Sequence, residues 1–240
     1  MSLSWKDNVV RSFAQKSSVY DQNCIIQQDI AQSLADDLPV SGVESILEIG
    51  CGTGNLTQHL FHKYAGKRLC ITDVSAEMVS RAKDKCLDEE ARWVVMDGEC
   101  PNVQGKYDLI VANMVFQWFE DIGAAVDRLS GMLNSGGSIF YSMPGPDSFR
   151  EWKETLDRLG LPLGVLEFHK SSDIYRDEII MHQYKDAVDF LRSMKTIGAG
   201  TARKDYTPLT HTEMKQACGA LDQSHGGNMT WHVLYGRIDG

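Results

Sequence analysis

The sequence Ser45-Ile46-Leu47-Glu48-Ile49-Gly50-Cys51-Gly52-Thr53-Gly54-Asn55 leads from an apolar run into three glycines at alternate positions. The apolar residues 46, 47 and 49 predict a short strand that is buried on both faces, as strands of parallel sheets are. The glycines permit a tight turn and a close approach of the backbone to a ligand, where a Cβ would obstruct it. A helical pattern begins near Asn55 and would point its positive N-terminal end at that ligand. The stretch therefore predicts a strand, a binding turn and a helix.

Two common kinds of ligand-binding turn are excluded by residues that this glycine-rich sequence lacks. The dinucleotide fingerprint G-x-G-x-x-G is not met, because Asn55 and Leu56 stand where its last residues would be. The Lys-Ser/Thr pair of a phosphate-binding P-loop is missing as well. The pattern E-x-G-x-G-x-G resembles motif I of the class I S-adenosylmethionine (SAM) methyltransferases. That resemblance implies that Glu48 helps to hold the glycine loop and the amino-acid end of the cofactor.

A glycine-rich turn can also be a strand-to-helix connection that needs glycine for its conformation and binds no ligand. The next strand provides evidence that distinguishes these two interpretations. Residues 69–72 are apolar, and Asp73 ends them a little over ~20 residues past the loop, as a ribose-binding acid should. Ser75 is predicted to cap the following helix, with Met78 in its first turn. Asp73 alone could be an ordinary loop acid. The glycine loop and the acid in this order favour SAM binding.

The remaining patterning predicts a doubly wound, mostly parallel seven-stranded α/β sheet with a small helical lid, in one domain over residues 1–240. Residues 1–40 and 144–205 are the candidate lid over the substrate. Asp147 is predicted to cap a helix that opens near residue 148, and Thr210 to cap another. In the resembled family the last strand inserts antiparallel at the sheet edge. Further strands are predicted over residues 93–96, 107–113, 138–143, 179–184 and 230–236, and helices over 8–13, 22–38, 76–87, 122–133 and 187–195.

The resemblance extends to the cofactor site. In the family, an acid after the third strand accepts a hydrogen bond from the adenine amino group, and Asp97 matches it. Residues 113–116 read Asn-Met-Val-Phe rather than Asn/Asp-Pro-Pro-Tyr/Phe, which disfavours methylation of nucleobase or glutamine amines. Asp108, before the fourth strand, is interpreted as a hydrogen-bonding residue of the core. The residues expected to bind the cofactor are Glu48, Gly50, Cys51, Gly52, Gly54, Asp73, Val74, Met78, Asp97, Gly98, Glu99 and Asn113.

Composition limits the partners. The net charge of -9 argues against a general affinity for nucleic acid or for an anionic membrane surface. No apolar run is long enough to span a bilayer, and the N-terminal residues do not resemble a signal peptide. The six cysteines show no C-x-x-C pairing and indicate the reduced thiols of a cytoplasmic protein. No metal site is predicted, because His59 and His62, three apart on a helix, lack an evident third ligand.

Other segments narrow the resemblance to biotin-pathway malonyl-acyl-carrier-protein O-methyltransferases, with a similarity over nearly the whole chain. Its most specific piece is Ser-Met-Lys-x-Ile-Gly-Ala at residues 193–199. Motif I departs from the pattern, because Glu48-Ile49 stand where relatives often have Asp-Ala or Asp-Leu. Residues 161–175 match weakly and are predicted to form a loop. The other segments that carry the resemblance are residues 116–118, 148–151 and 230–233.

The implied reaction is transfer of a methyl group from SAM to a free carboxylate. A malonyl carboxylate is ionised at neutral pH, so no general base is required. Tyr20, Gln117 and Arg150 are candidates to orient it, although each can instead be a packing or surface residue. Two alternatives stay open: an aconitate-type small-molecule carboxyl methyltransferase, and a non-catalytic SAM-binding protein.

A basic run is the candidate docking surface for an acidic acyl carrier protein. Its members are Arg192, Lys195, Arg203 and Lys204. An ordinary solvated helix face followed by a loop is the alternative interpretation of the same residues.

Overall fold

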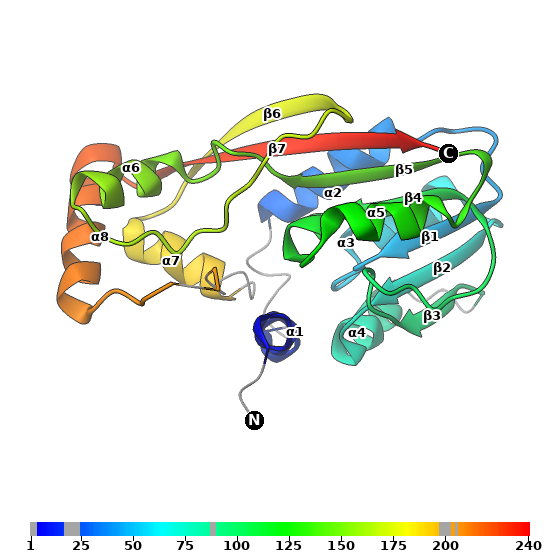
Figure 1. Ribbon diagram of the computed structural model, residues 1–240, viewed down its shortest axis with the longest axis horizontal. Helices are drawn as coiled ribbons and strands as arrows, with labels where there is room; N and C mark the ends of the chain where they lie inside the picture. Colours follow the sequence, from blue (N-terminus) through cyan, green and yellow to red (C-terminus); the bar gives the residue numbers. More distant parts are fainter. Residues whose placement is uncertain (1–3, 17–24, 87–89, 197–202, 205) are drawn as a thin grey trace.

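The computed structural model describes residues 4–16, 25–86, 90–196, 203–204 and 206–240. They form one seven-stranded sheet in the order β3-β2-β1-β4-β5-β7-β6 (Figure 1). The strands are β1 (Ser45–Ile49), β2 (Arg68–Asp73), β3 (Arg92–Val95), β4 (Tyr107–Asn113), β5 (Leu133–Pro144), β6 (Ile174–Gln183) and β7 (Asn228–Asp239). The first five run parallel, and β7 pairs antiparallel with both β5 and β6. The predicted doubly wound class and the antiparallel last strand are confirmed, but β6 rather than β7 forms the outer edge.

Helices follow the strands as the patterning predicts. Two predicted caps are confirmed: Ser75 Oγ accepts a hydrogen bond from Met78 N at 3.3 Å, and Thr210 forms a capping box with Glu213. The helices are α1 (Trp5–Lys16), α2 (Ile25–Asp37), α3 (Asn55–Lys63), α4 (Ala76–Cys86), α5 (Ile122–Ser130), α6 (Arg150–Arg158), α7 (Ala187–Thr196) and α8 (His211–His225), with the short 3-10 helix η1 (Phe116–Trp118).

The sheet is buried on both faces because successive side chains of its strands point to opposite sides. Ile46 of β1 packs with α2 and α3 in one hydrophobic core, whereas Leu47 packs with α5 and η1 in the other. Asp108 joins two central strands: its Oδ2 accepts hydrogen bonds from Glu44 N and Ser45 N, both at 2.9 Å. This is the core hydrogen-bonding role predicted for Asp108.

Three sequence-based boundaries were wrong, two of them because of a tertiary contact. Asp147 does not cap α6, which begins at Arg150 after a left-handed Phe149 with φ 58°. The Phe149 ring is buried against Trp231, 4.8 Å between centroids, and this packing fixes the turn. β6 begins at Ile174 rather than at 179, because β7 offers it a longer pairing edge. α5 ends at Ser130, and Leu133 already belongs to β5.

Helices α6, α7 and α8 gather at one end of β7, beyond the carboxyl ends of the parallel strands (Figure 1). Helix α1 is seen end-on in the same view, below the sheet and between α4 and α7. Both groups thus flank the sheet edge where open α/β folds bind ligands. None of the described helices has the length and apolar character needed to cross a bilayer.

Candidate active site

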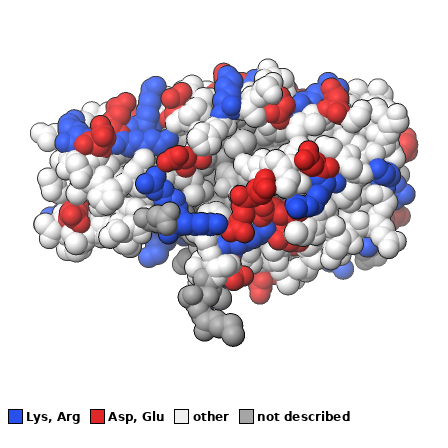
Figure 2. Space-filling model, in the orientation of Figure 1, with Lys and Arg blue, Asp and Glu red and all other residues white. Residues whose placement is uncertain are grey.

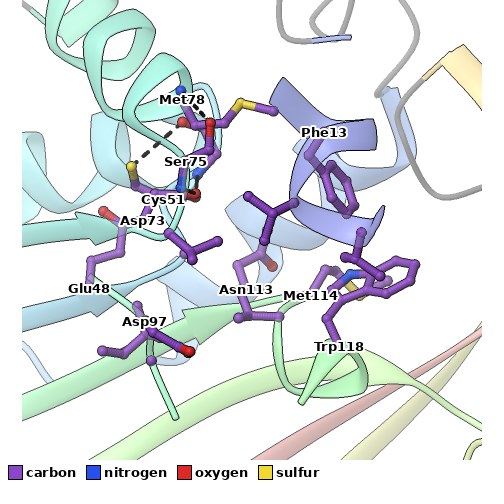
Figure 3. A pocket seen from close by; sticks show the side chains of 18 of the residues that line it. Phe13, Glu48, Cys51, Asp73, Ser75, Met78, Asp97, Asn113, Met114 and Trp118 are labelled. Carbon is purple, nitrogen blue, oxygen red and sulfur yellow. Dashed lines mark hydrogen bonds between the residues drawn. The ribbon is translucent and has the colours of Figure 1, made fainter. Parts of the chain in front are cut away.

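A cavity lies at the carboxyl ends of the strands, where the strand order reverses between β1 and β4. This switch point is where doubly wound sheets bind ligands. In Figure 3, Glu48, Asp73 and Asp97 lie on one side of the cavity, and Phe13 and Trp118 lie on the other. The residues that line the cavity at the carboxyl ends of successive strands are Gly50 to Gly52 at β1, Asp73 to Ser75 at β2, Met96 to Gly98 at β3, and Asn113 to Val115 at β4.

The glycine loop has the left-handed backbone that its sequence predicts. A Cβ added at Gly50, whose φ is 68°, would come within 2.5 Å of the Val115 side chain. A Cβ at Gly52, whose φ is 55°, would meet no protein atom within 4 Å and would project into the cavity that Gly52 lines. Gly50 is therefore needed for packing, whereas Gly52 leaves room for a ligand.

Two buried acids face this loop. Asp73 Oδ2 accepts a hydrogen bond from Gly52 N at 2.9 Å, and its Oδ1 accepts one from Ser75 N at 2.8 Å. Burial raises the pKa of Asp73, against the opposing effect of these hydrogen bonds. Glu48 is 1% exposed and accepts a hydrogen bond from Thr57 Oγ1 at 2.7 Å. Burial, followed by the nearby Asp73, raises the pKa of Glu48 to about 8. Burial likewise raises the pKa of the Cys51 thiol.

Asp97 and Glu99 hold α1 against the site. Lys6 Nζ lies 2.8 Å from Asp97 Oδ1 and also contacts Glu99 Oε2. Glu99 Oε1 accepts hydrogen bonds from Glu120 N at 2.8 Å and from Asp121 N at 2.9 Å. Asp97 lines the cavity, whereas Glu99 does not and ties the loop after β3 to the start of α5. The carboxylate of Asp97 at the cavity wall is thus already paired with Lys6.

The loop after β4 is strained at the cavity. Met114 has φ 57°, which is uncommon for a residue other than glycine. Its N–H donates to Ser142 O at 3.0 Å, and its carbonyl accepts from Gln117 Nε2 at 2.7 Å. Asn113 Oδ1 accepts from Ser142 Oγ at 2.7 Å. These bonds hold the backbone of Met114 where it borders the cavity.

A second cavity of about 710 Å³ adjoins the first. Its walls are mostly apolar and come from α1, α6, α7, the loop over residues 164–168 and β7. Both cavities share the side chains of Phe13, Gln27, Met114 and Trp118, so these residues mark the junction. The Phe13 ring meets Trp118 edge-on, with 5.3 Å between centroids. The site is thus a mostly apolar cavity edged by acidic side chains, which opens past aromatic residues into a larger apolar one.

The predicted residues fall into three groups. Of the twelve expected at the cofactor, ten line the first cavity; Gly54 precedes α3 and Glu99 lies behind Asp97. Gln117 lines the second cavity, but Arg150 lines neither cavity, and the Nε of this exposed side chain lies 3.3 Å from Oε1 of the buried Glu151. Tyr20 lies outside the described residues. The structure therefore does not bring Arg150 together with Gln117.

The basic residues are spread over two cavities. Lys195 lines the second cavity, whereas Arg203 and Lys204 line a third cavity of about 300 Å³. The second and third cavities share the lining residues Gln117, Leu166 and Phe168. Arg203 pairs with Glu167 at 3.0 Å and Lys204 with Glu120 at 2.7 Å. Arg192 lines none of these cavities.

Sequence reasoning missed four contributors from the first two helices, namely Lys6, Val9, Val10 and Gln27. Helical periodicity identifies a helix face but not the cavity that the face will meet. Gln27 could have been identified from its position, because it is a polar residue between the apolar positions 26 and 30, on the side of α2 expected to be buried. For the described residues, no group of three or more His, Cys, Asp or Glu side chains could hold a metal ion.

The strand order, the left-handed glycine loop and the acids at the carboxyl ends of β1 and β2 define a class I SAM-dependent methyltransferase. The methyltransferase domain family matches residues 47–139. The fold is also that of the N-methyltransferase NodS from Bradyrhizobium japonicum, solved with S-adenosylhomocysteine (SAH), at a TM-score of 0.54 and 18% identity, over 98% of this chain and 99% of that one.

Curated relatives identify the family more specifically than the domain and the fold do. A malonyl-[acyl-carrier protein] O-methyltransferase of Magnetococcus marinus is 32% identical over 90% of this chain and 87% of the relative. The biotin biosynthesis bifunctional protein BioCD of Bordetella avium is 28% identical over 96% of this chain, which spans 52% of that longer protein. The chain belongs to the malonyl-[acyl-carrier protein] O-methyltransferase family.

Proposed function

We propose that this protein transfers a methyl group from SAM to the free carboxylate of a malonyl thioester on acyl carrier protein, early in biotin synthesis. The observation that carries the proposal is the 32% identity, over most of both chains, to a relative of that name. The apolar cavity beside the cofactor cavity supports it, because an acyl group and its carrier arm need such a space. A cytoplasmic location is part of the proposal, in keeping with the free thiols of the described cysteines.

The residues of the first cavity fit SAM in their chemistry. When bound, SAM supplies a methyl group made electrophilic by its sulfonium. Glu48 would hold the cationic amino group of the cofactor, Asp73 its ribose hydroxyls and Asp97 its adenine amino group, with Gly52 leaving space for the backbone contact. Val74, Met78, Gly98 and Asn113 complete the walls.

The second cavity would orient the acceptor. The carboxylate is already a nucleophile at neutral pH, so the protein need only desolvate and align it. Gln117 stays a candidate donor, although one of its amide hydrogens is used by Met114 O. We further propose that residues 1–40 and 144–205 act as the substrate lid, since α1, α6, α7 and the loop over 164–168 supply most of the wall.

An acceptor panel with labelled SAM tests this function. Malonyl-carrier protein, a malonyl thioester without carrier protein, and free dicarboxylates such as aconitate are offered at equal concentration. Preferred methylation of malonyl-carrier protein is expected. Preference for a free dicarboxylate would instead identify an aconitate-type enzyme, and SAM binding with no acceptor methylated would identify a non-catalytic protein.

Glu48 makes SAM binding depend on pH. With a pKa of about 8 in the free protein, Glu48 is mostly protonated at neutral pH, whereas pairing with the ammonium of SAM requires the carboxylate. Binding should therefore release a proton, and affinity should rise between about pH 6 and pH 7.5, by up to about tenfold per pH unit. Calorimetry in two buffers of different ionisation enthalpy measures both quantities. Glu48→Gln should remove the pH dependence, and a flat profile in the wild type would contradict this role.

Docking of an acidic carrier protein needs local positive charge, because the enzyme itself carries a net charge of -9. Figure 2 shows basic and acidic side chains interspersed on the face seen there. Arg203 and Lys204 border the third cavity, and their partners Glu167 and Glu120 are exposed, so these ion pairs are weak and can be exchanged on docking. We propose that these two residues, with Lys195 and Arg192, receive the carrier protein.

Reversing both charges, Arg203→Glu with Lys204→Glu, should raise the KM for malonyl-carrier protein several-fold at low salt. SAM affinity and activity on a carrier-free malonyl thioester should stay unchanged, because neither uses this surface. The difference should shrink at about 0.5 M salt, where the Debye length is only about 4 Å. Lys67→Glu with Arg68→Glu makes the same change in net charge at the start of β2 and should have little effect. Equal KM values for the two double variants at low salt would refute the docking role.

A further inference from the structure

Gln27 is a largely buried residue whose amide faces two cavities. It is 7% exposed, and its side chain lines both the cofactor cavity and the apolar cavity. Within the ranges that the structure describes, no group is bonded to this amide. The buried carboxylates Glu48, Asp73 and Glu151, by contrast, each accept at least one hydrogen bond. The fully buried side-chain atom without a partner in the described residues is Gln117 Oε1, so the Gln27 amide is not sealed off but opens onto the cavities. An amide that faces a cavity and is not bonded to the protein is available to orient a ligand group.

The position of Gln27 on α2 favours an anion. Gln27 stands in the first turn of this 13-residue helix, which begins at Ile25. The backbone N–H groups of a first turn have no partner within the helix, and the helix dipole makes this end positive. Of the lysines that line these two cavities, Lys6 is paired with Asp97 and Glu99, and Lys195 lines the apolar cavity but not the cofactor cavity.

We propose that Gln27 binds the acceptor carboxylate through its amide N–H at the junction of the two cavities. This inference rests on the carboxyl methylation proposed above. A neutral amide can fix one carboxylate oxygen while leaving the charge, and hence the nucleophilicity, of the group intact. The other oxygen then forms a bond to the methyl carbon as the bond from that carbon to sulfur breaks. The electron pair of the broken bond stays on sulfur, which becomes a neutral thioether, and no proton is transferred.

A Gln27→Met variant tests this assignment, since methionine keeps the length of the side chain but cannot donate a hydrogen bond. Binding of malonyl-carrier protein and of acetyl-carrier protein is measured in the presence of SAH. The wild type should prefer the malonyl form, and Gln27→Met should bind both forms equally, with kcat/KM for methylation lowered roughly 10- to 100-fold. SAM affinity should change by less than about twofold.

The matched control is Gln32→Met, on the same helix, where the exposed amide donates only to Asp36 Oδ1 at 2.8 Å. It should behave as wild type. Gln27→Glu supplies a readout that a packing role would not give, because protonated glutamate can donate whereas the carboxylate repels the acceptor. Its activity relative to wild type should rise as pH falls through the pKa of that glutamate.

Two results would overturn the assignment: a malonyl preference retained by Gln27→Met, or a loss of SAM affinity equal to the loss of acceptor affinity. The second would place Gln27 at the amino-acid end of the cofactor. Failure of the wild type to methylate malonyl-carrier protein would refute the proposed function instead. The experiment distinguishes failure of the Gln27 assignment from failure of the proposed function, because the binding comparison uses SAH and needs no turnover.

Discussion

Asp73→Ala is expected to weaken the binding of SAM and of SAH alike by roughly 2–4 kcal/mol, if it removes two charge-assisted hydrogen bonds to the ribose. That loss corresponds to roughly 30- to 1000-fold in Kd. Both ligands should be affected equally, because the ribose is common to them and the methyl group is distant from it. Titration calorimetry on the folded variant measures the two affinities.

The control separates ribose binding from support of the backbone. Asp73 also accepts hydrogen bonds from Gly52 N and Ser75 N, so its removal leaves two buried donors without a partner. Asp108 has the same kind of structural role at the opposite end of β1, through Glu44 N and Ser45 N. Asp108→Ala should therefore lower thermal stability while SAM affinity changes by less than about twofold. Lost activity with intact affinity for both ligands in Asp73→Ala would show a different role.

The parts of the site that sequence predicts are those set by local chain geometry. A buried strand, a glycine turn and the first residue of a helix follow one another within eleven consecutive residues. The local path of the chain therefore brings residues 48–55 to the sheet edge. Asp73 and Asp97 follow the same rule, because Asp73 ends β2, Asp97 lies two residues past the end of β3, and these parallel strands end at a common edge.

The remaining features depend on contacts between distant segments. Lys6 meets Asp97 across 91 positions, and nothing in the pattern of α1 indicates that pairing. Phe149 adopts a left-handed conformation because Trp231 and Phe190 enclose its ring, which overrides the capping preference of Asp147. The junction between the two cavities likewise combines residues of α1, α2 and the loop after β4. Sequence thus located the residues that line the first cavity far better than those that line the second.

Gly52→Val should reduce SAM affinity by more than roughly 100-fold, because the new side chain would occupy the space where the cofactor meets the loop. The structure makes this substitution unusually informative. A Cβ at Gly52 meets no protein atom within 4 Å, so the side chain would obstruct a ligand rather than the core. The cost to the fold is limited to the left-handed backbone, on the order of 1–3 kcal/mol.

Gly226 supplies the matched control. It ends α8 with φ 56°, against 55° for Gly52, and a Cβ there also meets nothing within 4 Å. Gly226 lines none of the three cavities described above. Gly226→Val should therefore lose about as much stability as Gly52→Val while keeping wild-type SAM affinity. If both folded variants bound SAM as the wild type does, the glycine loop would not be the cofactor site, because a branched side chain at Gly52 cannot share that space with a ligand.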